Sequence, residues 1–175
     1  MSSCASCRTA RNRAGCGGRV HRQAHPDRGC AGRGGVRHPP HAYVPGRTAR
    51  HPEGAFDPIR DSVAPGVPAE ELAVSDAFVT GLRFLDEGFY WEAHEVLEPV
   101  WMACPDPSPE REAVQALIQV ANAGVKARMG RPRAVARIAA LVEDHLDRVG
   151  ADMVLGQSIE GIRARLERVR RNSAI

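Results

Sequence analysis

The sequence predicts an all-α protein, an antiparallel bundle of four to five helices preceded by an extended, proline-rich strap and a disordered N-terminal arm. Three observations lead to this prediction. Apolar residues recur at helical spacing through residues 70–172, as they do in helices that bury one face. Proline and glycine interrupt this pattern at short intervals, where a bundle would place its loops. No strand-like alternation stands out in the same stretch.

The arm, residues 1–38, contains no Leu, Ile, Phe, Tyr, Trp, Lys or Glu. It cannot bury enough apolar area to offset chain entropy, so we expect it to be disordered. Its arginines could bind phosphates non-specifically. Its Cys4-x2-Cys7 pair could bind zinc with other Cys and His residues, but a second cysteine pair is missing. The composition also fits GC-rich DNA read upstream of the true start, and the arm would then not belong to the natural protein.

The net charge of +3 conceals two opposite regions. Residues 1–52 hold ten Arg against one Asp, whereas residues 53–175 hold 14 Lys and Arg against 20 Asp and Glu. A basic arm thus precedes an acidic domain, and we predict no specific nucleic-acid binding. The chain has neither a long apolar run nor an apolar signal region near its start. We therefore expect no membrane insertion and a cytoplasmic location, with the five cysteines reduced.

The strap, residues 39–69, is dominated by proline and glycine. Proline fixes its own φ angle and restricts the residue before it, so we expect extended or turning chain. Apart from Met1 and the valines, Tyr43, Phe56 and Ile59 are the first large apolar residues of the chain. We expect these side chains to fasten the strap to the helical domain.

The helical domain, residues 70–172, divides at its glycines and prolines. Ser108 is a good N-cap before Pro109, and Gly88 and Gly150 follow two of the expected helices as stop residues. Pro99 falls inside one helix, where we expect a bend or bulge. Leu141 is among the residues expected to face the core. The expected helices are Glu70–Glu87, Tyr90–Ala103, Pro109–Met129, Pro132–Val149 and Ser158–Arg171.

Two motifs stand out in this domain: Phe89-Tyr90-Trp91-Glu92-Ala93-His94-Glu95-Val96-Leu97-Glu98 with Trp101, and Leu117-Ile118-Gln119-Val120-Ala121 with Gly130. They resemble the domain of unknown function 309 family, over roughly residues 75–146. The resemblance implies a small all-α bundle, found in bacteria and archaea, with no established activity. Lys126 stands where many members carry His, which weakens a two-histidine metal site in this chain.

His94 lies on the apolar face of its helix, where a buried imidazole needs partners for both nitrogens. We expect carboxylates and amides of two neighbouring helices to supply them and to fix how the helices pack. Alternatively, these residues could line a pocket for a small molecule or an anion. The cluster comprises His94, Glu95, Glu98, Trp101, Gln115, Gln119, Asn122 and Lys126.

Trp91 and Met102 lie off the core stripe of the same helix. We expect them to contact the strap or to mark the face of a homodimer.

A metal site is the third interpretation of the His94 region. His94 and Glu98 are four residues apart and could share a divalent metal ion, with Glu92, His145 or Gln119 as a third ligand. No other cofactor is predicted. The favoured function is a binding or scaffolding module with a buried His/Glu/Gln cluster. The alternative is a metal-dependent hydrolase using His94, Glu95 and Glu98, so the sequence leaves open whether the protein is an enzyme.

Overall fold

The computed structural model describes residues 38–173, so the predicted disordered arm lies outside the described residues except for His38. The described chain is mainly helical, as predicted, with one short β-hairpin. The helices are α1 (Asp57–Arg60), α2 (Ala69–Ala73), α3 (Asp76–Glu87), α4 (Tyr90–Ala103), α5 (Pro109–Arg128), α6 (Pro132–Val149) and α7 (Ile159–Ser173), and the strands are β1 (Met153–Val154) and β2 (Gln157–Ser158).

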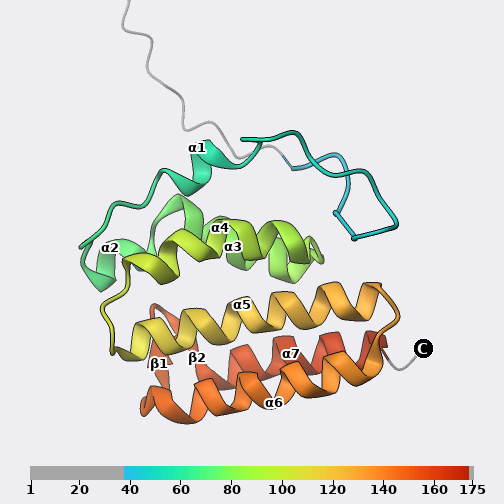
Figure 1. The fold of residues 1–175 in the computed structure, drawn as a ribbon. Coiled ribbons are helices and arrows are strands. Elements are labelled where there is room, and N and C mark those ends of the chain that lie inside the picture. Colours follow the sequence, from blue (N-terminus) through green and yellow to red (C-terminus); the bar gives the residue numbers. More distant parts are fainter. Residues whose placement is uncertain (1–37, 174–175) are drawn as a thin grey trace, which may run out of the picture. The chain divides into compact units, whose positions relative to one another are not determined.

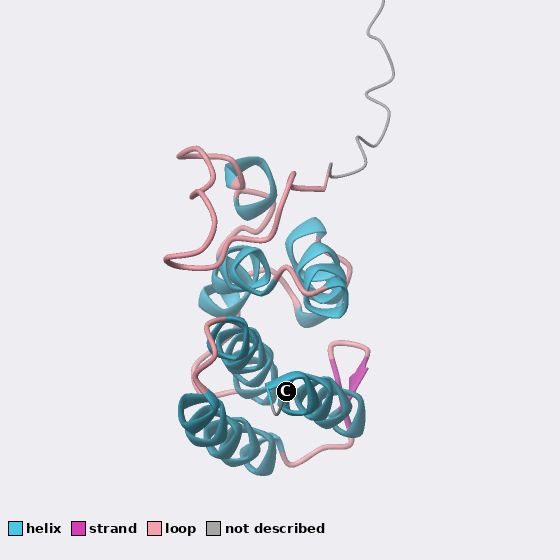
Figure 2. Ribbon diagram, turned by 90° about the vertical axis from the view of Figure 1, so that its right-hand side faces the viewer, coloured by secondary structure: helices cyan, strands magenta, loops and turns pink. Residues whose placement is uncertain are grey.

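The five long helices form the bundle, and successive helices run antiparallel (Figure 1). Helix α5 lies between the α3/α4 pair and the α6/α7 pair (Figure 2). It packs against α4 on one side and against α6 and α7 on the other. This central place explains why α5 is the helix richest in buried residues.

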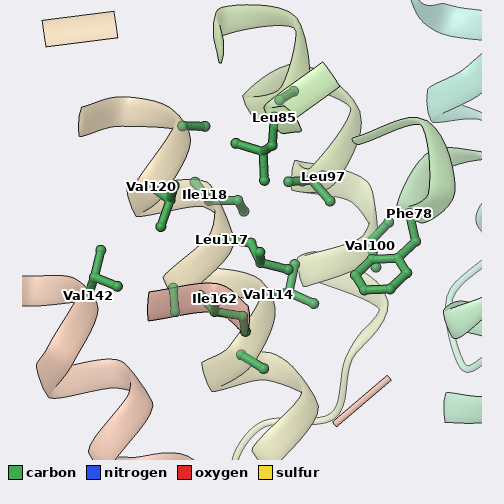
Figure 3. Packing of buried hydrophobic residues seen from close by; sticks show 14 of the residues in the cluster. Phe78, Leu85, Leu97, Val100, Val114, Leu117, Ile118, Val120, Val142 and Ile162 are labelled. Atoms are coloured by element: carbon green, nitrogen blue, oxygen red, sulfur yellow. The ribbon is translucent and has the colours of Figure 1, made fainter. Parts of the chain in front are cut away.

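The core is mainly aliphatic and continuous from α3 to α7, with Phe78 and Phe84 of α3 among its members. Figure 3 shows Val114 and Leu117 of α5 in the same core as Leu97 of α4 and Ile162 of α7. Each of these side chains is 0–1% exposed. Burial of one such side chain contributes about 1.5–3 kcal/mol, so helix packing rather than helix propensity holds the bundle together.

The helix ends follow the predicted signals. The Ser108 hydroxyl accepts a hydrogen bond from the Arg111 amide at 3.1 Å and caps α5. Gly88 and Gly150 end α3 and α6 with φ angles of 83° and 67°. These left-handed conformations are costly for residues with a Cβ atom, which explains the choice of glycine. Helix α4 continues through Pro99 up to Ala103.

The prediction of one helix over residues 70–87 is wrong. The structure divides this stretch into α2 and α3. Ser75 causes the break because its hydroxyl accepts from the Phe78 amide at 3.2 Å and donates to the Leu72 carbonyl at 2.8 Å. A side chain that bonds both flanking backbones stabilises a cap in place of a continuous helix.

Three further differences from the prediction are local. The strap contains a single helical turn, α1, as well as extended chain. The β1/β2 hairpin precedes α7, with Met153 opposite Ser158. Leu141, expected to face the core, is 47% exposed. The buried face of α6 runs through Val135, Ala139 and Val142, and Leu141 lies beside that stripe.

An ion-pair network joins α5 to α6. Glu112 accepts hydrogen bonds from His145 Nδ1 at 2.7 Å and from Arg148 Nε at 3.1 Å. Burial acts to raise the pKa of Glu112, but the hydrogen bonds from His145 and Arg148 outweigh it, and the net shift is downward from 4.5. A carboxylate with a lowered pKa stabilises the fold above its unfolded-state pKa and loses that contribution as pH falls.

We therefore expect Glu112→Gln to lower the free energy of unfolding at pH 7 by up to about 1 kcal/mol, the range for a partly exposed pair. The difference from the wild type should shrink as pH falls below about 4.5. Urea denaturation at pH 7, 5 and 3 measures this. Glu110→Gln, in the same first turn of α5, is the matched control. A difference that stays constant across this pH range would contradict the assignment.

Candidate functional site

His94 does contact the neighbouring helix, through an amide. It is half-buried on α4, and its Nδ1 lies 3.0 Å from Oδ1 of Asn122 on α5. Because the amide oxygen only accepts, Nδ1 carries the hydrogen in this arrangement. Asn122 in turn donates to Gln119 Oε1 at 3.3 Å. A polar chain of three side chains thus links α4 to α5.

The other predicted members of this cluster lie elsewhere. Arg60 of α1 lies 3.5 Å from a Glu95 carboxylate oxygen and 3.9 Å from one of Glu98, so both carboxylates face the strap. Trp101 lies under the guanidinium of Arg111, 4.0 Å from ring centroid to Cζ. Gln115 and Lys126 form no side-chain hydrogen bond or ion pair within residues 38–173. The structure therefore brings together His94, Asn122 and Gln119 but not the whole set.

The residues of the hydrolase alternative do not converge. His94 pairs with an amide, while Arg60 holds both Glu95 and Glu98. Within residues 38–173, no group of three or more His, Cys, Asp and Glu side chains could hold a metal ion. Burial, and secondarily Glu110, raises the pKa of the Cys104 thiol to about 11. That thiol is protonated at neutral pH and is a poor nucleophile.

A buried His/Glu pair is present, but its members are His51 of the strap and Glu92 of α4. Glu92 is 0% exposed. Its Oε1 accepts hydrogen bonds from His51 Nε2 and from the Tyr43 amide, each at 2.6 Å. Its Oε2 is buried without a hydrogen-bond partner in the described chain. One carboxylate oxygen therefore joins two points of the strap to the helix.

An aromatic cluster surrounds this pair. Ring centroids of Tyr43, His51 and Phe56 lie 5.1, 6.0 and 6.1 Å from that of Trp91. The expectation that Trp91 contacts the strap is confirmed, and so is the fastening role of Phe56, which is buried. Met102, by contrast, is 58% exposed.

Beside the aromatic cluster, the strap and α4 enclose a cavity of about 570 Å³. It combines a tryptophan face with charges of both signs. Arg50 lies over the Trp91 ring at 5.8 Å, and Arg60 bridges to Glu95 at 3.5 Å. The cavity is lined by Arg50, His51, Pro52, Glu53, Gly54, Ala55, Phe56, Asp57, Arg60, Trp91 and Glu95.

Residues 78–138 match the family model described as "Domain of unknown function (DUF309)". This region is a DUF309 domain. Searches of curated proteins and of solved structures found no match to the chain. The family assignment made from the sequence is thus confirmed, and it carries no activity with it. None of the helices among residues 38–173 is long and apolar enough to cross a membrane.

The DUF309 region and the strap contribute differently to the cavity. The matched residues supply Trp91 and Glu95, whereas every other lining residue precedes the match. The buried Glu92 also belongs to the match but does not line the cavity. Sequence reasoning missed His51, Arg50 and Arg60 because it looked for partners of the polar residues of α4 only within the long helices. The available signal was the cluster of large apolar residues in the strap, which already required that segment to lie on the domain.

Proposed function

We propose that this protein is a binding module that holds a small polar ligand in the cavity between the strap and α4. The cavity itself carries this proposal. Its volume of about 570 Å³ lies within the range of roughly 300–1,000 Å³ usual for small-molecule sites. The enzyme alternative lacks comparable support, since the groups it requires point to different partners.

The charges around the cavity indicate the chemistry of the ligand. Arg50, Glu53 and Asp57 form no ion pair within the described chain. Arg60 is already opposed by Glu95 and Glu98. A ligand with one carboxylate and one ammonium group would satisfy the open charges of both signs, as a free amino acid or a peptide end does. Guanidinium–carboxylate pairs are strong and geometrically specific.

The buried Glu92 fixes the position of the strap, which lines most of this cavity. It anchors the strap at His51 and at the Tyr43 amide, and the two anchors precede the lining residues Glu53 and Asp57 in the chain. A lining segment that is ordered before the ligand binds lowers the entropic cost of binding. The same pair therefore serves a scaffolding role, and the ligand contacts come from its exposed neighbours.

The test is a titration of the full chain with free amino acids, one at a time, each compared with its C-amidated and N-acetylated forms. We expect at least one free amino acid to bind, detected by calorimetry and by quenching of Trp91 in a Trp101→Phe background. Blocking either charged group should weaken binding at least about tenfold, a loss of 1.4 kcal/mol. Failure of every free amino acid and of simple dipeptides to bind would overturn the proposal.

Matched variants locate the site. Arg50→Gln should weaken binding of the free amino acid and make it indifferent to C-amidation, because the carboxylate partner is gone. Arg133→Gln removes the same charge from an exposed position outside the cavity and should leave the affinity unchanged. Equal losses in both variants would place the binding elsewhere.

A further inference from the structure

One end of the three-helix layer α5–α7 is strongly basic. It lies where α5 ends, α6 begins and α7 ends, and Figure 1 shows these three points together at the side of the C-terminus. A cavity of about 190 Å³ lined by Arg128 of α5 and Arg165 and Arg168 of α7 confirms that α5 and α7 meet here. The cationic residues of this basic end are Lys126, Arg128, Arg131, Arg133, Arg137, Arg165, Arg168, Arg170 and Arg171.

Much of this charge is not neutralised. Arg131, Arg133 and Arg137 are exposed and form no ion pair within the described chain, and together they line a shallow hollow at the start of α6. The sequence contains no Asp or Glu between residues 113 and 142. The region is therefore free of carboxylates over most of α5 and the first half of α6.

Carboxylates do face part of the basic end, from α3 and α7. Asp86 accepts from Arg165 at 3.0 Å and from Arg168 at 2.6 Å, and Glu167 pairs with Arg170 at 2.9 Å. Glu87, which also lines the smaller cavity, pairs with His38. Three carboxylates against nine cations leave a clear local excess of positive charge.

The opposite end of the same three helices is acidic. Figure 1 places the start of α5, the end of α6 and the start of α7 together there. The positive potential is thus concentrated at one end of an acidic domain and does not reflect its overall charge. The acidic residues of that end are Asp106, Glu110, Glu112, Glu143, Asp144, Asp147, Asp152 and Glu160.

We propose that the basic end binds the phosphate backbone of a nucleic acid without reading its sequence. All but one of its cations are arginines, whose planar guanidinium groups match phosphate oxygens in pairs. Tyr90 is the only aromatic residue that lines the two hollows at this end of the described chain, and the Arg128 guanidinium already lies over its ring at 5.7 Å. The basic end therefore has no row of aromatic rings on which successive bases could stack. Phosphate contacts alone give affinity without sequence preference.

The observations favour a nucleic acid over an anionic membrane. Binding to a membrane surface is strengthened by apolar side chains that enter the lipid beside the charges. The exposed large hydrophobic residues among residues 38–173 are Val74, Val79, Met102, Leu141 and Met153. Only Leu141 is near the basic end, four residues past Arg137 on α6. This proposal is independent of the ligand cavity, which shares no residue with the basic end.

The test measures binding of the full chain to a 20-base-pair duplex DNA of arbitrary sequence by fluorescence anisotropy, between 25 and 200 mM salt. The variant is Arg131→Gln/Arg133→Gln/Arg137→Gln. We expect at least a tenfold loss of affinity at low salt. The slope of log K against log salt should become shallower by roughly two to three, because each phosphate contact contributes about 0.9. A duplex of a second sequence should bind equally well.

The N-terminal arm supplies a control of equal charge. Arg8→Gln/Arg11→Gln/Arg13→Gln removes the same three charges from a segment outside the basic end. It should reduce affinity and slope clearly less. Equal losses in the two triple variants would mean that binding follows net charge alone, and would overturn the proposal. So would an unchanged slope in the first variant, or binding to phosphatidylserine vesicles without binding to DNA. Thermal melting of both variants checks that each is folded.

Discussion

His51→Ala should lower the free energy of unfolding by about 3–5 kcal/mol, the usual cost of breaking a buried charge pair from one side. The substitution leaves the carboxylate of Glu92 at 0% exposure with the Tyr43 amide as its remaining hydrogen-bond donor. Urea denaturation of the full chain measures the loss. An effect this large from a residue of the strap would show that the strap is part of the folding unit.

Two comparisons separate the charge pair from simple loss of packing. In a Glu92→Gln background, His51→Ala should cost distinctly less, because no charge is then left unpaired. His41→Ala removes the imidazole that stacks on His51 at 4.8 Å but has no carboxylate partner among residues 38–173, and it should cost less than half as much. If His51→Ala costs the same with and without the Glu92 carboxylate, the pair is not what anchors the strap.

Gly124→Ala should also destabilise the protein, by roughly 1–3 kcal/mol, the range for overpacking a core. A Cβ atom at Gly124 would lie 2.6 Å from Cδ2 of Tyr90 and closer still to Cγ and Cδ1. These ring atoms lie next to the α4 backbone, so they can yield only if α4 moves away from α5. The higher helix propensity of alanine offsets at most about 1 kcal/mol of this cost.

The companion variant removes the ring. Tyr90→Ala/Gly124→Ala should be no less stable than Tyr90→Ala alone, because the added methyl group then meets no aromatic atoms. Thermal or urea melting of the three variants completes the cycle. A double variant that loses the full sum of both single effects would show that Gly124 is required for some reason other than its contact with Tyr90.

Sequence reasoning recovered the features that depend on neighbouring residues. The starts of α5 and α6 follow from Pro109 and Pro132, and the end of α6 follows from Gly150, since these residues act on the backbone beside them. The buried stripe of α7 likewise follows from its 3.6-residue period. The break at Ser75 went unrecognised because a serine hydroxyl can equally well face solvent from inside a helix.

The candidate site depends on distant contacts, and here the prediction was weaker. His94 and Asn122 are 28 residues apart and meet because α4 and α5 are antiparallel, which the bundle prediction already implied. His51 and Glu92 are 41 residues apart, and the intervening strap has no periodicity that would fix its path. Nothing in the local pattern distinguishes a glutamate that faces a strap from one that faces water.

The residues that match DUF309 are fewer than the residues that the folded core requires. A gene fragment trimmed to residues 78–138 would encode Glu92 without His51, because the histidine lies upstream of the match. It would also lack Ile162 and Leu166, both 0% exposed against the rest of the core. Such a truncated polypeptide would expose apolar side chains of the core and would leave the Glu92 carboxylate without its histidine partner. We expect it to aggregate when expressed. Recombinant work on this domain therefore needs its flanking sequence on both sides.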